Sequence, residues 1–144
     1  ATVADVYRLL GELDAAHDQA ASADNAAKNA PATQQRLARM IGLDARDGSA
    51  EEWLAFARQW KHHQLQTLHR EVQRVKQLHG LAENTLLIGA GCGDFLVREL
   101  GANAIGYASH VARVSTQALP HAARWAQVCA PSVAVATLLS LRVD

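Results

Sequence analysis

Apolar side chains recur every three or four residues along much of the chain, which is the spacing of one face of an α-helix. The pattern predicts a helix over residues 2–10 and a second one that begins near Pro31, with Asn29 as its N-cap, and ends at Gly42. The buried face of this second helix is expected to consist of three residues: Leu37, Met40 and Ile41. Residues 14–30 almost lack large apolar side chains and are expected to form an irregular, partly exposed loop.

The longest predicted helix begins at Ser49 and ends at Gly80, because Ser49 followed by Glu52 is a capping box. Its apolar residues at helical spacing are Trp53, Phe56, Ala57, Trp60, Leu65, Leu68, Val72, Val75 and Leu78. At 1.5 Å per residue the helix is about 45 Å long, so we expect it to cross a whole domain or line an interface. Polar Lys61 and Gln64 interrupt the apolar face, which argues against a coiled coil.

The second half of the chain predicts one short strand-helix-strand unit followed by helix. The expected elements are a buried strand over 85–88, a helix over 94–100, a strand over 104–108, an ambiguous stretch over 111–119 and helix over 121–141. Pro131 either kinks this last helix or begins a new one. We therefore divide the chain into a helical portion, residues 1–80, and a strand-glycine-helix portion with a C-terminal helix, residues 81–144.

Composition and charge narrow the function classes. Lys plus Arg and Asp plus Glu number 14 each, so no basic excess favours nucleic acid. No apolar run has membrane-spanning length, and the 2 cysteines are too few for a disulfide framework. These features are typical of a reduced cytoplasmic protein. The four histidines of the long helix lack the spacing of a zinc site and are expected on a solvated face: His62, His63, His69 and His79.

The glycine-rich turn after the first strand is the clearest chemical motif. Gly89, Gly91 and Gly93 allow close approach of a ligand to the backbone, and a helix begins behind them at Asp94. We therefore consider these four residues a ligand- or phosphate-binding loop, with a tight turn that binds nothing as the alternative. The glycine spacing also matches the first motif of S-adenosylmethionine methyltransferases. No acidic residue follows the strand 104–108 to bind ribose, which argues against that class.

Asp24 and Lys28 are the second candidate site. They lie four residues apart in the small-residue loop, where the lysine could hold a diphosphate and the aspartate a metal or a proton. An ordinary solvated loop is the alternative.

Five segments in the same order make the chain resemble one known family. They are residues 2–11, 23–28, 36–42, 87–97 and 125–136. The chain is similar to tetrahydromethanopterin-linked one-carbon transfer pathway proteins, relatives of hydantoinase A and oxoprolinase in the acetate kinase, Hsp70 and actin superfamily. This resemblance implies an α/β fold, a ribonuclease-H-like (actin-like ATPase) half-domain with a large helical portion.

The resemblance also implies an activity. Archaeal relatives of methanofuran biosynthesis condense a furanmethyl diphosphate with a tyramine phenol and release pyrophosphate. By this likeness Asp24 and Lys28 are the catalytic acid and base, and Gly89, Gly91 and Gly93 face the diphosphate or nucleotide. Mg²⁺ and Lys28 would bind the diphosphate, while Asp24 would hold the metal or accept the phenolic proton. The family has glycine where this chain has Asn25, which also tolerates positive φ.

The superfamily's Asp-x-Gly-Gly phosphate loop has no counterpart here, so we expect the chain to be the C-terminal part of a longer protein. The missing N-terminal half, or another chain, would then complete the ligand cleft. Two alternatives stay open. One is an ATP-dependent hydrolase or kinase of the hydantoinase-oxoprolinase type. The other is a non-catalytic module that associates, as a homodimer or with another subunit, through the tryptophan-rich half of the long helix.

Overall fold

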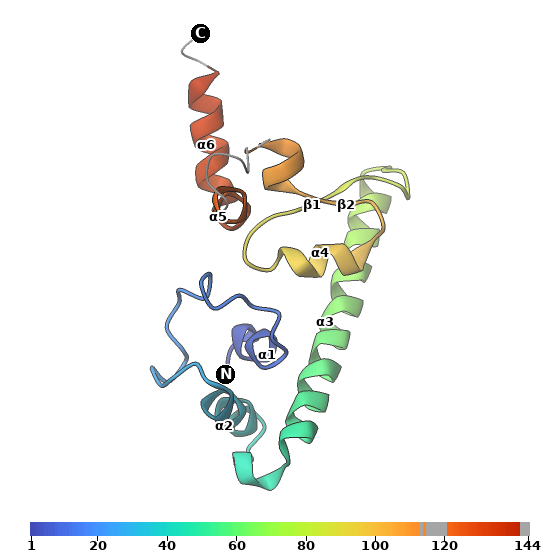
Figure 1. Cartoon of the computed structure of the whole chain (residues 1–144). Helices are drawn as coiled ribbons and strands as arrows, with labels where there is room; N and C mark the ends of the chain where they lie inside the picture. The colour runs from blue at the N-terminus through green and yellow to red at the C-terminus, as the bar shows by residue number, and fades with distance from the viewer. Residues whose placement is uncertain (113, 115–120, 142–144) are drawn as a thin grey trace. The chain divides into compact units, whose positions relative to one another are not determined.

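The computed structural model describes residues 1–112, 114 and 121–141, and these are mostly helical with one small parallel sheet (Figure 1). The chain divides into two compact units, Ala1–Leu68 and His69–Asp144, and the division falls within the long helix α3 (Ala50–Leu78). Among the helices described, none is both long enough and apolar enough to cross a membrane.

The first unit is built from α1 (Val3–Leu9), α2 (Ala30–Met40), a short 3₁₀ turn η1 (Ala45–Asp47) and the N-terminal part of α3. Helices α1 and α2 pack against one another. The centre of the core is formed by Val6, Leu37 and Ala57, one from each helix, and the partly buried Leu9, Leu10, Phe56 and Trp60 surround it.

Local signals place these helices where the sequence predicts them. The side chain of Asn29 accepts a hydrogen bond from the N–H of Ala32 at 3.0 Å, which caps α2. At the start of α3 the Glu52 carboxylate accepts the Ser49 N–H at 2.7 Å, and Ser49 Oγ accepts the Glu52 N–H at 3.2 Å. The Ser49 N–H and the Ser49 hydroxyl, which donates to the same carboxylate at 2.9 Å, lower the pKa of Glu52 because they favour its charged form.

The expected buried face of α2 is only partly right. Leu37 is fully buried, but Met40 and Ile41 are exposed. The inner face of α2 is instead completed by Thr33 and Arg36. The buried residues of α2 end at Ala38, so Met40 and Ile41 lie in solvent at the C-terminal end of the helix.

The apolar face of α3 is buried at its N-terminal end and exposed at its C-terminal end, where Leu78 is 70% exposed. Lys61 and Gln64 do not interrupt the packing of this helix. Lys61 Nζ lies 2.5 Å from a carboxylate oxygen of Glu12, and Gln64 accepts a hydrogen bond from the hydroxyl of Tyr7. Both polar residues therefore attach α3 to α1 and the segment that follows it.

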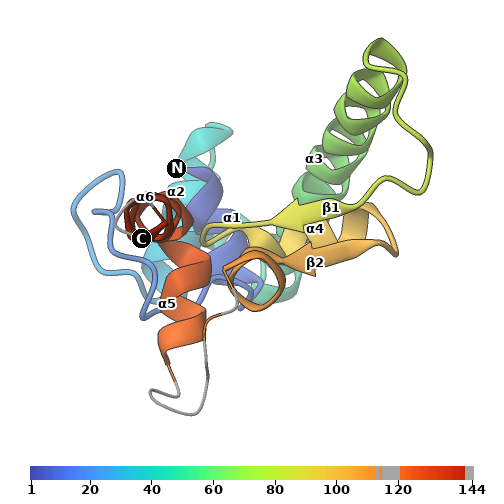
Figure 2. The same cartoon turned by 90° about the horizontal axis from the view of Figure 1, so that it is seen from above.

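The second unit contains the predicted strand-helix-strand unit. Strands β1 (Leu87–Gly89) and β2 (Ala104–Gly106) are parallel, with Ile88 opposite Ile105, and α4 (Asp94–Leu100) packs on both (Figure 2). The strand begins two residues later than expected. Ile88 is half exposed rather than buried, because successive strand side chains point to opposite faces and α4 covers one of them.

The chain leaves β2 through a π-helical turn, η2 (Tyr107–Val111), so the second strand is shorter than the predicted 104–108. Helices α5 (Ala122–Val128) and α6 (Ala130–Ser140) follow. Pro131 lies in the first turn of α6 and begins a new helix, which decides between the two alternatives for this residue. The stretch 111–119, ambiguous in the sequence, lies largely outside the described residues.

Candidate functional site

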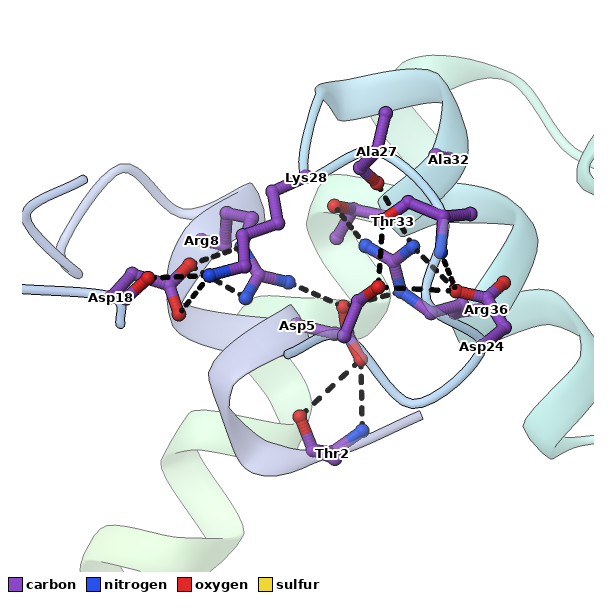
Figure 3. A network of polar contacts seen from close by, with 12 residues as sticks. Thr2, Asp5, Arg8, Asp18, Asp24, Ala27, Lys28, Ala32, Thr33 and Arg36 are labelled. Atoms are coloured by element: carbon purple, nitrogen blue, oxygen red, sulfur yellow. Dashed lines mark hydrogen bonds and ion pairs between the residues drawn. The ribbon is translucent and has the colours of Figure 1, made fainter. Parts of the chain in front are cut away.

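Six charged side chains of the first unit form a chain of ion pairs in which the sign of the charge alternates (Figure 3). In order they are Lys28, Asp18, Arg8, Asp5, Arg36 and Asp24; we call this set the charge chain. Its successive N–O distances are 3.2, 2.6, 2.6, 2.7 and 3.1 Å. The predicted residues Lys28 and Asp24 are its two ends.

The middle of the charge chain is buried. The side chain of Asp5 is 0% exposed and that of Arg36 is 2% exposed. Burial by itself raises the pKa of Asp5, but the Thr2 N–H, at 2.8 Å, and the guanidiniums of Arg36 and Arg8 outweigh it and lower the pKa. Asp5 is therefore a carboxylate at neutral pH, and it joins α1 to α2.

Arg36 connects α2 to the loop 14–29. Its guanidinium donates to the Ala27 carbonyl at 3.0 Å and to Thr33 Oγ1 at 3.1 Å, besides its two carboxylate partners. Burial tends to lower the pKa of Arg36, but Asp5 and Asp24 more than offset this effect and raise it. A loop that has few apolar side chains is thus held in place by charge.

Asp24 lies at one end of the charge chain with 33% of its side chain exposed. Its Oδ1 accepts the Ala26 N–H at 3.1 Å and the Arg36 guanidinium at 3.1 Å. These two interactions lower the pKa of Asp24. The next residue, Asn25, has φ 55°, and in the described part of the chain it is the one non-glycine residue with positive φ.

Lys28 lies at the other end, also with 33% of its side chain exposed. Its ammonium contacts both the carboxylate and the main-chain carbonyl of Asp18. Asp24 and Lys28 are therefore not paired with one another. The structure places them in one network, in which Arg8 and Arg36 bind the intervening acids.

The glycine loop lies in the second unit. Gly91 has φ 88°, a conformation that favours glycine, and its N–H donates to the Gln127 carbonyl at 2.7 Å. At Gly89 a Cβ would lie 3.3 Å from Val97 Cβ, so this glycine serves the close packing of β1 on α4. The main-chain N–H groups of Cys92 and Gly93 form no hydrogen bond with any other described residue.

Asp94, the last of the predicted loop residues, is buried and faces two arginines. Arg124 Nη1 lies 3.1 Å and Arg98 Nη2 lies 3.7 Å from its carboxylate. All three line an open hollow of about 460 Å³, whereas none of Gly89, Gly91 and Gly93 does.

The remaining sequence candidates lie at the surface. The four histidines of α3 and the segment after it are exposed, and so are the free thiols of Cys92 and Cys129. Within the residues that the structure describes, no three His, Cys, Asp or Glu side chains gather as a metal site would require.

No protein-family model matches this chain. A search of curated proteins also finds no match. The family resemblance in the five segments therefore stays a prediction.

Sequence reasoning missed Asp5, Arg8, Asp18 and Arg36. One signal was present: Asp5 and Arg8 are three residues apart in a predicted helix, the spacing of an ion pair. Arg36 gave no such signal, because its two acidic partners are 12 and 31 residues away in sequence.

Proposed function

We propose that the chain is the C-terminal part of a diphosphate-releasing synthase of the methanofuran type, with a ribonuclease-H-like fold completed by the rest of the protein. The observation that carries the proposal is the placement of Lys28 and Asp24. They are the ends of the charge chain and each is one-third exposed, while the side chains between them are at most 12% exposed. The loop thus presents one cation and one anion to solvent on a fixed frame.

The backbone at Asn25 supports the family resemblance. The family has glycine at this position, and the φ of 55° found here is one that glycine adopts freely and asparagine tolerates. The substitution therefore preserves the path of the loop between Asp24 and Lys28.

Lys28 is suited to bind the diphosphate. An ammonium group has three N–H donors, and the contacts of Lys28 with Asp18 use two of them. The third is available to a phosphate oxygen. Stabilising the negative charge that grows on the leaving oxygens is a large term in reactions of this kind.

Asp24 fits a cation better than a proton. Because its pKa is lowered, it is a weak base at neutral pH, so we assign it to Mg²⁺ rather than to the phenolic proton. Its Oδ1 is occupied by Ala26 and Arg36, which leaves Oδ2 for a metal. One carboxylate together with substrate phosphates is a common way to hold Mg²⁺. The ion would add positive charge beside the diphosphate.

The test is pyrophosphate release by the intact protein, given a furanmethyl diphosphate and a tyramine phenol. Lys28→Gln should lower kcat by roughly 100-fold, the effect of removing one donor to a developing oxyanion. Lys28→Arg should recover part of this loss. Arg46→Gln is the matched control, since Arg46 is an exposed cation of the same unit with only a long contact to Asp44. Unchanged pyrophosphate release in Lys28→Gln would remove Lys28 from the site.

An ATP-dependent hydrolase or kinase is the second candidate, favoured by the hollow beside the parallel strands of the second unit. Calorimetry of the intact protein with ATP separates the two proposals, because the synthase needs no ATP. The alternative of a non-catalytic module that associates through the tryptophan-rich half of the long helix is less well supported. Trp53 and Ala57 of that half are buried in the core of the first unit.

A further inference from the structure

The hollow in the second unit is lined by all three residues of β2 and by residues that follow each of the two parallel strands. Asp94 begins the helix after β1, Gly106 is the last residue of β2, and Ser109 and His110 belong to the turn that follows it. Ligands of parallel α/β sheets bind beyond the carboxyl ends of the strands. At about 460 Å³ the hollow also has the size of a small-molecule site.

The charges around this hollow do not balance. Arg124 and Arg98 approach the single carboxylate of Asp94, one at 3.1 Å and the other at 3.7 Å. One carboxylate neutralises one guanidinium, so a positive charge is left over. Each guanidinium has five N–H donors, and most of them remain after the contact with Asp94.

The wall that carries Arg124 is fixed to β1 and to the turn after β2 by a buried glutamine. Gln127, one turn later on α5, donates from its amide to the Gly89 carbonyl and accepts the Ala108 N–H at 2.9 Å. At Gly106 a Cβ would lie only 3.3 Å from Gln127 Oε1, so the glycine leaves room for this connection. Arg124 is thus held on a firm frame, whereas Arg98 lies at the rim with 74% of its side chain exposed.

We propose that this hollow binds the phosphate group of a small phosphorylated molecule, with Arg124 and Arg98 as its contacts and Asp94 as the residue that orients them. The planar fork of a guanidinium matches phosphate oxygens in geometry and charge. The hydroxyl of Ser109, which lies 2.8 Å from His110 Nδ1, adds a polar group on the same wall. The site goes beyond the proposed function, because it lies in the other unit and does not involve Lys28.

The test is calorimetric titration of the full chain with pyrophosphate. We expect saturable binding that Arg98→Gln weakens three- to tenfold and Arg124→Gln weakens more. Asp94→Asn should weaken binding, because Arg124 and Arg98 lose the carboxylate that orients them. Arg74→Gln is the matched control: Arg74 belongs to the same unit, is exposed and pairs with Glu71. Repeating the titration with adenosine monophosphate distinguishes an organic phosphate from the free anion.

Arg98→Gln keeps the test decisive, because this exposed side chain has only a long contact with Asp94 and its loss should leave the fold intact. Absence of saturable binding would overturn the inference, and so would an equal loss in Arg74→Gln. If Lys28→Gln abolished pyrophosphate binding and Arg98→Gln did not, the anion would belong to the first unit. The inference would then fail while the proposed function stood.

Discussion

Replacing Asp5 by asparagine should destabilise the first unit by about 3 kcal/mol. The carboxylate accepts four hydrogen bonds: from the Thr2 N–H at 2.8 Å, the Thr2 hydroxyl at 3.4 Å, Arg8 at 2.6 Å and Arg36 at 2.7 Å. Asparagine keeps one carbonyl oxygen, so the two guanidinium bonds become bonds to a neutral acceptor, each weaker by about 1 kcal/mol. The amide group then faces the Thr2 N–H, and losing this cap costs about 1 kcal/mol more. The total agrees with the ~3–5 kcal/mol typical of breaking a buried ion pair.

Urea unfolding followed by tryptophan fluorescence measures this loss. Trp53 and Trp60 report on the first unit, so the experiment is best done with Trp125→Phe in the background. A loss of 3 kcal/mol lowers the melting temperature by roughly 10 °C for a chain of this size. The control is Glu51→Gln, an exposed carboxylate in the first turn of α3, which should change stability by less than about 0.5 kcal/mol.

The double variant Asp5→Leu with Arg36→Met tests whether these two residues stabilise the first unit as a pair. If the energy of Arg36 depends on its buried partner, removing both should cost less than the sum of the two single losses, with a coupling of about 2 kcal/mol. A change below about 0.5 kcal/mol in Asp5→Asn, or additive single losses, would refute the view that this buried pair supports the first unit.

Three further predictions follow from local geometry. Gly91→Ala should destabilise the second unit by about 1–2 kcal/mol, because a φ of 88° is strained for a residue with a side chain, even though no atom lies near the added Cβ. Thermal melting followed by circular dichroism measures this loss, and an unchanged melting temperature would contradict the left-handed conformation of this turn. Ser49→Ala should lower the stability of α3 by about 1 kcal/mol in urea unfolding, and Ser49→Asp should largely restore it. Acidification should weaken the first unit. Because the pKa of Asp5 is lowered in the folded state, its stabilisation is complete above the ordinary value of 3.8 and is lost as pH falls below it, so Asp5→Asn should show a shallower acid transition than the wild type.

Elements with strong local signals could be predicted from sequence. The helix Asp94–Leu100 has the expected bounds, and the capping box at Ser49 marks the start of α3. Burial was harder to predict from sequence, because it depends on which element packs against a helix face. Met40 and Ile41 have the spacing of a buried face, yet both are exposed at the C-terminal end of α2, where no described element covers that face.

The sequence indicated only part of the candidate site, because the rest of it also depends on how the helices pack. Lys28 and Asp24 are conspicuous because they are charged residues in a loop of small ones. The charge chain that connects them, however, passes through Arg8 and Asp5 of α1 and Arg36 of α2. Such partners depend on how the helices pack, which periodicity alone does not specify. In the second unit the glycines indicated the turn correctly, while the arginines that face the hollow lie on helices and gave no pattern.

The central claim is that the charge chain, rather than apolar packing, holds the loop 14–29 and so presents Lys28 and Asp24. Amide hydrogen exchange tests it most directly at the Ala26 N–H, which donates to the Asp24 carboxylate. The account predicts that Asp5→Asn speeds exchange at Ala26 at least tenfold while the amides of α6 are unchanged. Equal exchange at Ala26 in both proteins would contradict it.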